Sequence, residues 1–333
     1  MASILVTGGA GYIGSVCCRQ LLEQGHRVTV VDDLSTGDAE AVPANVSFHR
    51  ADMGDMENLA AIVSTYAIDA VFHFAAKALI PESVTNPGAF FHVNVARGIA
   101  LLEGLRIHGV RKFIFSSTAA VYGNPNKIPI PETHGKEPIN SYGESKLIFE
   151  RILKWYASAY GWSVAAFRYF NACGAGKDWG ERHEPETHIL PLLLQTASGR
   201  RPQFEIYGTD YPTPDGTCLR DYVHVVDIAH AHVLALQKMN GPGFRDYNIG
   251  TGRSHSVREI CRAAEKISKR KIRMCDRPRR PGDPPVLCAD PRKIIEELSW
   301  TPNHSELDEI VTGAWEWEQT LCSQLATGSK VAT

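Results

Sequence analysis

The sequence predicts a doubly wound α/β fold, in which helices cover both faces of a parallel β-sheet, together with a smaller and discontinuous second α/β domain. Two observations favour this fold class. Over the first 170 residues, short apolar runs rich in β-branched and aromatic residues alternate with segments of helix length. A glycine-rich turn directly follows the first apolar run. The alternation predicts a parallel sheet because parallel neighbours need a crossover connection, usually a helix.

The elements of the first half follow one another in a regular order. The apolar runs are typical of strands that are buried on both faces. The expected strands cover residues 4–7, 27–31, 46–49, 70–75, 112–117 and 163–169. The expected helices lie between them and cover residues 12–24, 55–65, 83–108 and 142–160.

After Asn171 the pattern changes. A loop rich in glycine and charge precedes an expected helix at 187–198, and a Pro/Gly/Asp loop covers 208–216. CLRDYVHVVDIAHAHVLALQ predicts a strand and then a helix, and FRDYNIG predicts one further strand. We therefore expect a first domain of residues 1–170 to which 221–250 return, a second domain of 171–220 and 251–326, and a disordered tail of 327–333.

Composition excludes several classes of protein. A hydrophobic content of 44% and a charged content of 22% are those of an ordinary soluble protein. A net charge of −2 provides no general attraction for nucleic acid or an anionic membrane. The sequence has no apolar run of membrane-spanning length, no basic leader before its first strand, and eight cysteines without a Cys-x-x-Cys pair. We expect a cytoplasmic protein with reduced thiols.

The glycine-rich turn has the spacing of a dinucleotide-binding loop. Gly8, Gly11 and Gly14 follow the first strand and open the first helix, where glycines permit a tight turn and N–H groups point at a pyrophosphate. Asp32 and Asp33 end the next strand, beginning 18 residues beyond Gly14. A carboxylate there accepts hydrogen bonds from a ribose and repels a 2′-phosphate. The sequence therefore predicts a Rossmann-type site that binds NAD rather than NADP.

Tyr142 and Lys146 lie four residues apart near the start of the expected helix 142–160. Side chains at i and i+4 share one face of a helix, so a phenol and an ammonium at this spacing can occupy one pocket. No other tyrosine in the chain has a lysine four residues later.

Eight segments together resemble the extended short-chain dehydrogenase/reductase family, and within it the sugar-nucleotide 4-epimerases. They occur in order over nearly the whole chain: VTGGAGYIGS (6–15), DDLSTG (32–37), HFAA (73–76), FSSTAAVYG (115–123), SYGESK (141–146), RYFNACGA (168–175), IYGTDYPTPDGTCLRDYVHV (206–225) and RRPGD (279–283). The first and fifth are typical of the superfamily, and the last two are more specific. The resemblance implies NAD-dependent, reversible 4-epimerisation of UDP-glucose and UDP-galactose through a 4-keto intermediate, by a homodimer that pairs through helices 83–108 and 142–160.

The resemblance also implies the site residues. The catalytic group would be Tyr142 as the base, Lys146 and Thr118. The NAD site would contain Gly8, Gly11, Tyr12, Ile13, Gly14, Asp32, Asp33, Asp52, Met53, Phe74, Ala75, Ala76, Asn94, Ser116, Tyr142, Lys146 and Tyr169. The UDP-sugar would contact Thr118, Asn171, Tyr207, Arg220, Arg280, Asp283 and Leu287.

The implied chemistry agrees with these residue types. Lowering the pKa of a tyrosine from about 10 to about 7 requires roughly 4 kcal/mol of preferential stabilisation of the anion. One ammonium at about 4 Å contributes on the order of 4 kcal/mol at an effective dielectric constant of about 20. We therefore expect Lys146, helped by the positive nicotinamide, to hold Tyr142 as a phenolate near neutral pH. Ala119 and Ala120 follow Thr118 where related dehydratases carry an acidic pair, so a dehydratase is not expected.

Two departures from the family pattern leave questions open. Many relatives carry a cofactor-contacting lysine at the position of Ala78, whereas here Lys77 lies one place earlier. Leu287 stands where some relatives have tyrosine and others a small residue that admits an N-acetyl group. Alternative substrates are therefore UDP-N-acetylhexosamines and UDP-pentoses. A different alternative is a catalytically silent protein that binds NAD and UDP-sugars.

Two further clusters are interpreted as structural. The basic stretch 268–281 is a single run without interleaved aromatic residues, so we expect a solvated surface and no nucleic-acid partner. Histidines 183 and 188 with glutamates 184 and 186, and histidines 224, 230 and 232, show no recognised ligand spacing. We therefore expect no metal.

Overall fold

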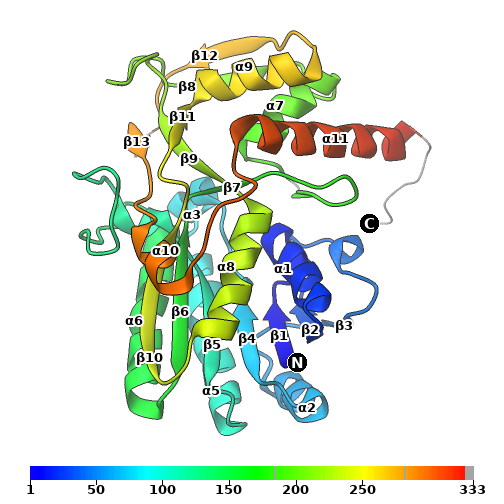
Figure 1. The fold of residues 1–333 in the computed structure, drawn as a ribbon, viewed down its shortest axis with the longest axis vertical. Coiled ribbons are helices and arrows are strands. Elements are labelled where there is room, and N and C mark those ends of the chain that lie inside the picture. Colours follow the sequence, from blue (N-terminus) through cyan, green and yellow to red (C-terminus); the bar gives the residue numbers. More distant parts are fainter. Residues whose placement is uncertain (184, 281–282, 327–333) are drawn as a thin grey trace.

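A seven-stranded parallel sheet forms the larger half of the chain in a computed structural model that describes residues 1–183, 185–280 and 283–326 (Figure 1). The strand order is β10-β6-β5-β4-β1-β2-β3, and all neighbouring pairs are parallel. The bounds are β1 (Ser3–Thr7), β2 (Arg27–Asp32), β3 (Ser47–Arg50), β4 (Ala70–His73), β5 (Lys112–Thr118), β6 (Ser163–Tyr169) and β10 (Gly243–Ile249). The predicted fold class is confirmed. Strands β1 to β3 are added toward one edge of the sheet and β4 to β6 toward the other, so the order of the strands reverses between β1 and β4. Doubly wound sheets bind ligands at such a point.

Helices cover both faces of this sheet. One face packs against α1 (Tyr12–Glu23), α8 (Val225–Lys238) and α10 (Arg292–Leu298), and the other against α2 (Met56–Tyr66), α5 (Gly98–Ile107) and α6 (Ser141–Tyr160). Alternate residues of β1 point to opposite layers, so Ile4 and Val6 join the first core and Leu5 joins the second. This two-sided burial explains why the strands are continuous apolar runs.

The predicted helix 83–108 is wrong as a single element. The structure has α3 (Ile80–Thr85), α4 (Pro87–Phe91), a π-helical segment (His92–Arg97) and then α5. Asn86, with φ −135° and ψ 61°, separates the first two helices because the residue before a proline disfavours helical backbone. The π-helical turn carries the buried Asn94, and such turns are frequent at functional sites.

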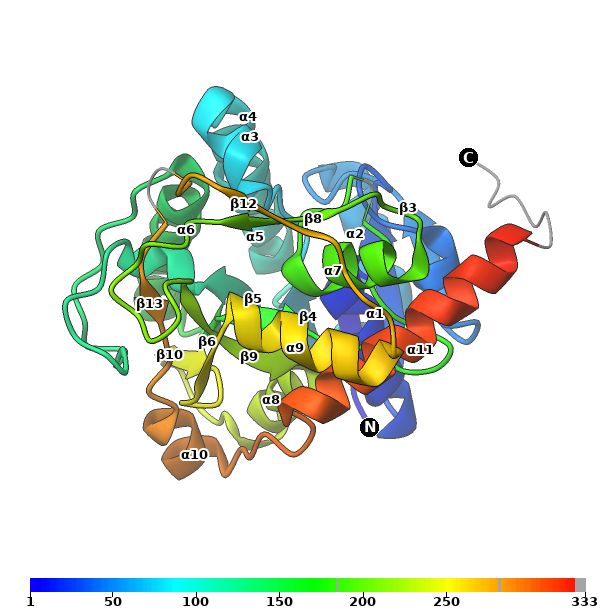
Figure 2. The same cartoon turned by 90° about the horizontal axis from the view of Figure 1, so that it is seen from above.

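The smaller half lies beyond the carboxyl ends of the large sheet, because the chain passes directly from the end of β6 into β7 (Figures 1 and 2). Its strands are β7 (Asn171–Cys173), β8 (Phe204–Tyr207), β9 (Leu219–His224), β11 (Ser254–Ser256), β12 (Met274–Arg277) and β13 (Val286–Leu287). Its helices are α7 (Ile189–Ser198), α9 (Val257–Ser268) and α11 (Leu307–Ala326), which share an apolar core.

The return of β10 to the large sheet, where it pairs with β6, agrees in position with the expected strand in FRDYNIG. The exact division into domains stays a prediction, and the expected disordered tail, 327–333, lies outside the described residues. All eight cysteines are free thiols. Within the described part of the chain, no helix combines the length and apolar character needed to cross a membrane.

Candidate active site

The glycine loop connects β1 to α1 at the carboxyl edge of the sheet. Gly8 has φ +75°, and a Cβ on it would lie 2.4 Å from the backbone nitrogen of Ala75. A Cβ on Gly14 would lie 2.2 Å from the carbonyl oxygen of Gly8. Gly11 is the N-cap of α1 and makes no side-chain cap, so the first N–H groups of the helix lack a capping side chain. This bare helix start fits a dinucleotide pyrophosphate.

Tyr12 and Ile13 open α1. Tyr12 is buried, and its hydroxyl donates a short hydrogen bond to the carbonyl oxygen of Gly174, in the smaller half. Ile13 packs against the core beneath the helix. The start of α1 is therefore fixed to both halves of the molecule.

Two acidic side chains lie at the end of β2, of which Asp32 is the last residue. Asp32 accepts the N–H groups of Ala10 and Leu34, each at 2.9 Å. Burial raises the pKa of Asp32, and these two N–H groups act in the opposite direction. Asp33 is exposed and accepts the N–H of Ser35 at 2.9 Å. Asp32 therefore shapes the glycine loop, and Asp33 faces solvent beside it.

Asp52 and Met53 follow β3. Asp52 forms a short ion pair with Arg97, and Met53 is buried. Both side chains line a small cleft with Thr7 and Val31, at the carboxyl ends of β1 and β2. The structure therefore brings these two residues next to the glycine loop.

The segment after β4 is held by Asn94. Phe74, Ala75 and Ala76 are partly exposed. The side chain of Asn94 accepts the N–H of Lys77 at 2.8 Å and donates to its carbonyl at 3.0 Å. The Lys77 ammonium is ion-paired with Glu82 at 2.8 Å, with both side chains about one third exposed. In this structure the lysine is therefore engaged with Glu82.

Residues of β5 and α6 form the catalytic group. Lys146 is buried, and its Nζ donates to the carbonyl oxygen of Ser116 at 2.8 Å. The same Nζ lies 4.9 Å from the ring centroid of Phe115. The Tyr142 hydroxyl is hydrogen-bonded to the side chain of Thr118. The three predicted catalytic residues thus gather at the end of β5.

Two side chains outside the predicted set, Asn140 and Ser145, hold this group in place. Asn140 caps α6 by accepting the N–H of Gly143 at 2.8 Å. Ser145 donates to the carbonyl of Tyr142 at 2.7 Å and accepts from Asn94 at 2.9 Å. An Asn before a helical pattern is an N-cap signal, so Asn140 was detectable. The contact of Ser145 with Asn94 spans 51 residues and leaves no local signal.

The expected phenolate includes a contribution from the positive nicotinamide and stays a prediction; in the protein alone, burial acts against it. Burial raises the pKa of Tyr142 above its ordinary value of 10.0, and the hydrogen bond with Thr118 acts in the opposite direction. Burial lowers the pKa of Lys146 from 10.5 to about 7. Desolvation favours the neutral form of each group. The attraction between the two charges acts against this desolvation cost.

Tyr169 ends β6 and is buried. Its hydroxyl lies 2.7 Å from Nε2 of His232, on α8, and burial raises the pKa of Tyr169. Burial also lowers the pKa of His232 to about 4. The histidine is a neutral core residue, in agreement with the expectation that it is a satisfied polar group.

The predicted UDP-binding side chains form two pairs in the smaller half. The Arg280 guanidinium lies 4.0 Å from the ring centroid of Tyr207. Arg220 is nearly buried and forms a short ion pair with Asp283. In the protein alone, Asp283 is therefore engaged with an arginine that is itself a predicted UDP-binding residue.

Leu287 and Asn171 lie on strands that flank β9. Leu287 pairs in register with Arg220 and packs against the small core around Tyr122 and Phe170. Asn171 pairs with Tyr222 on β9. Both residues are partly exposed, so β9 is the element that assembles this part of the site.

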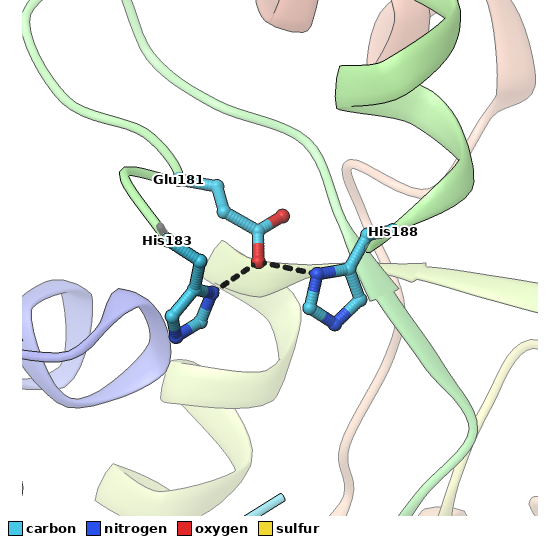
Figure 3. Close-up of side chains that lie close together, drawn as sticks. All are labelled: Glu181, His183 and His188. Carbon is cyan, nitrogen blue, oxygen red and sulfur yellow. Dashed lines mark hydrogen bonds and ion pairs between the residues drawn. The ribbon is translucent and has the colours of Figure 1, made fainter. Parts of the chain in front are cut away.

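Glu181 gathers two histidines (Figure 3). One of its carboxylate oxygens lies 2.7 Å from Nδ1 of His183 and 2.8 Å from Nδ1 of His188. Glu186 lies 2.9 Å from the same atom of His188. Burial alone would lower the pKa of His188, but Glu181 outweighs it and raises the pKa to about 10. The atoms of Glu181, His183 and His188 that could ligate a metal lie within 4.8 Å of one another. Their spacing in the sequence is not that of a recognised metal-binding motif.

Comparison with known proteins gives consistent matches over the chain. The family described as NAD dependent epimerase/dehydratase matches residues 4–250. A UDP-glucose 4-epimerase of Corynebacterium glutamicum is 43% identical over 99% of both chains, and one of Lacticaseibacillus casei is 46% identical over 95% of this chain and 97% of its own. A crystal structure of the enzyme from Stenotrophomonas maltophila, with bound NAD and formylated UDP-arabinopyranose, has a TM-score of 0.92 and 38% identity over 97% of this chain and 99% of its own.

Proposed function

The chain belongs to the NAD dependent epimerase/dehydratase family, and from this membership we propose that it interconverts UDP-glucose and UDP-galactose by epimerisation at C4. The observation that carries the proposal is full-length similarity to 4-epimerases combined with a buried lysine, a tyrosine and a threonine gathered at the end of β5. NAD supplies the chemistry of taking a hydride from C4 and returning it to the opposite face.

Tyr142 is the proposed base. It takes the proton of the sugar 4-hydroxyl as C4 becomes a ketone, and it returns a proton when the ketone is reduced. The hydrogen bond between Thr118 and Tyr142 supports a role for Thr118 in passing this proton. When Lys146 is protonated, its ammonium stabilises the Tyr142 phenolate. The hydrogen bond from Lys146 Nζ to the carbonyl oxygen of Ser116 holds the ammonium in the same buried site.

The residues proposed to bind NAD lie around the carboxyl ends of six neighbouring strands, β1 to β6. The glycine loop and Tyr12 meet the pyrophosphate, and Asp32 and Asp33 meet the adenosine ribose. Asp52 and Met53 bound the adenine side. The nicotinamide side is formed by Phe74, Ala75, Ala76, Asn94, Ser116 and Tyr169.

The UDP moiety is proposed to bind in the smaller half. Arg220 and Arg280 are suited to a pyrophosphate because guanidinium groups make two parallel hydrogen bonds to such oxygens. Arg280 already stacks on Tyr207, which supports a planar stack that a uracil ring can extend. Most of the binding energy then comes from contacts with the UDP moiety. The ketosugar is therefore free to rotate, so that either face of C4 can accept the hydride.

The test is incubation of the purified protein with UDP-galactose, with and without added NAD, followed by chromatography of the sugar nucleotides. Appearance of UDP-glucose up to an equilibrium mixture is the expected result. Bound NAD is quantified in the same sample. Protein that contains NAD and converts no UDP-sugar, beside an active control epimerase, would refute the proposal and favour a silent binding protein.

Substrate breadth is tested in parallel. Leu287 is intermediate in size between a tyrosine and a small residue, so we propose that hexoses are preferred over N-acetylhexosamines. Competition between UDP-galactose, UDP-N-acetylgalactosamine and a UDP-pentose measures the preference directly. A Leu287→Gly variant with relatively faster turnover of the N-acetyl substrate is expected.

A cytoplasmic homodimer is proposed as the working form. Large apolar side chains are exposed on α5 and α6, among them Ile107 at 65% and Trp155 at 75%. Helices α5 and α6 are joined by a contact of Arg106 with the ring of Tyr160. Exposed apolar groups on two adjacent helices favour pairing with a second copy. Light scattering of the wild type and of Trp155→Glu is the measurement, with a smaller mass expected for the variant.

A further inference from the structure

A segment of the smaller half reaches the loop that follows β2. We name residues 177–183 the strap. A cleft at the start of α1 is bordered on one side by the strap residues Gly180, Arg182 and His183 and on the other by Ala10, Gly11, Tyr12, Thr36, Asp38 and Ala41. The strap therefore lies beside the helix start proposed to bind the pyrophosphate of NAD.

Arg182 connects the strap to that loop. Its guanidinium nitrogen lies 3.1 Å from the carboxylate of Asp38 and 3.2 Å from that of Glu40. The Arg182 side chain is only 17% exposed, and its guanidinium lies 5.0 Å from the ring centroid of Trp317. Partial burial of Arg182 and Asp38 reduces screening of their ion pair by solvent, whereas Glu40 is 58% exposed and its pair is an ordinary surface contact.

The loop residue that Arg182 holds is itself attached to the glycine loop. The N–H of Asp38 donates to the carbonyl oxygen of Ala10 at 3.0 Å. Asp38 also caps the short helix Ala39–Ala41 through the N–H of Glu40. Movement of Asp38 away from the glycine loop therefore requires Arg182 to release it.

The strap has a rigid support on its other side. The indole N–H of Trp317 donates to the carbonyl of Glu181 at 3.1 Å, and a Cβ on Gly180 would lie 2.4 Å from the Trp317 ring. The Glu181 side chain is held by His183 and His188 (Figure 3). These contacts attach the strap to α11 and to His188, so the strap can act as a support that restrains the loop.

We propose that Arg182 retains the cofactor: its ion pairs with Asp38 and Glu40 close the strap over the loop of residues 33–40 and slow the release of NAD. The inference rests on the proposed function, because it requires NAD at the glycine loop. Asp33, proposed to bind the adenosine ribose, belongs to this same loop. Opening the loop far enough for the adenosine to leave breaks both ion pairs.

The experiment measures the release of NAD from the whole protein. Wild type and Arg182→Ala are loaded with NAD and desalted rapidly, and the NAD that remains bound is followed by chromatography. Release from Arg182→Ala is expected to be about tenfold faster, the change that ~1.4 kcal/mol produces. Arg182→Lys keeps the charge and is expected to recover most of the retention. Added NAD is expected to restore the turnover that Arg182→Ala loses after desalting.

The matched control is Arg200→Ala. It removes an ion pair of 3.0 Å with Glu318, which belongs to the same helix as Trp317, and it leaves the strap contacts intact. Its NAD release is expected to equal that of wild type. Glu40→Gln is expected to speed release in wild type and to add little in the Arg182→Ala background.

The outcomes separate this inference from the proposed function. Equal release rates for wild type, Arg182→Ala and Arg200→Ala would overturn the role of Arg182 while leaving NAD binding intact. Wild type that retains no NAD and shows no saturable binding would instead overturn the proposed function and the inference with it. If Arg182→Ala does not fold, as judged by circular dichroism, Asp38→Asn decides, because it removes the charge of the more buried partner and keeps a side chain that can cap the helix Ala39–Ala41: unchanged release refutes the restraint.

Discussion

Replacing Lys146 by Met is expected to remove a large pH dependence from the stability of the NAD-free protein. Lys146 is 2% exposed, and burial lowers its pKa from 10.5 to about 7. Between these values the unfolded chain binds a proton that the folded chain does not, so the free energy of unfolding rises with pH. The pKa difference is about 3.5, and each unit corresponds to ~1.36 kcal/mol, which gives about 5 kcal/mol over the whole window.

The assay is urea unfolding of both proteins, stripped of NAD, at about pH 7, 8 and 9. Relative to Lys146→Met, wild type should gain about 1.4 kcal/mol of stability per pH unit. Other groups titrate in this range, but they are present in both proteins, so the difference between the two curves isolates Lys146. Loss of the hydrogen bond to Ser116 shifts the variant by an amount that does not depend on pH. A stability difference that stays constant from about pH 7 to 9 would refute the argument that burial neutralises this lysine.

Three further predictions follow from named contacts. Tyr142→Phe should lower turnover of UDP-galactose by about 10²–10⁴, measured by chromatography, and unchanged turnover would place the base elsewhere. Arg168→Met should lower the free energy of unfolding, measured in urea, by about 3–5 kcal/mol. The side chains of Arg168 and Glu150 are fully buried and 2.6 Å apart, so the variant leaves the Glu150 carboxylate buried without its cationic partner. A loss below about 1 kcal/mol would contradict this. Glu181 raises the pKa of His188 from 6.5 to about 10, so the stability that this contact contributes is complete below about pH 6.5 and is lost as pH rises through 10. In thermal unfolding, His188→Ala should not show this loss of stability at high pH. Identical pH profiles for wild type and variant would exclude the charged contact.

The larger half of the fold was predictable because its strands are buried on both faces. The run SVAAFRY coincides with β6, and the other predicted strands differ from the observed ones by at most two residues at either end. The broken helix was the main error. Pro87 is visible in the sequence and disfavours helical backbone at Asn86, so this break was predictable. The π-helical turn at Asn94 left no comparable signal.

The candidate site was predictable where it depends on local spacing. The helical period places Tyr142 and Lys146 on one face, and a strand end presents Thr118 at the same edge of the sheet. Contacts between distant segments were not predictable. The pairing of Arg220 with Asp283 spans 63 residues, and the strap contact of Arg182 with Asp38 spans 144. The first contact depends on how the smaller half folds and the second on how the two halves pack, and residue spacing encodes neither.

The ionisation of the catalytic pair is a joint property of both side chains. Burial raises the pKa of Tyr142 and lowers that of Lys146, so each group alone favours its neutral form. Transfer of one proton from phenol to amine creates an anion and a cation together. At a separation of about 4 Å and an effective dielectric constant of about 20, their attraction would be on the order of 4 kcal/mol, which opposes the desolvation cost of the two charges. A buried lysine with a pKa near neutrality is therefore suited to this role, because it accepts the proton that a permanently charged arginine could not.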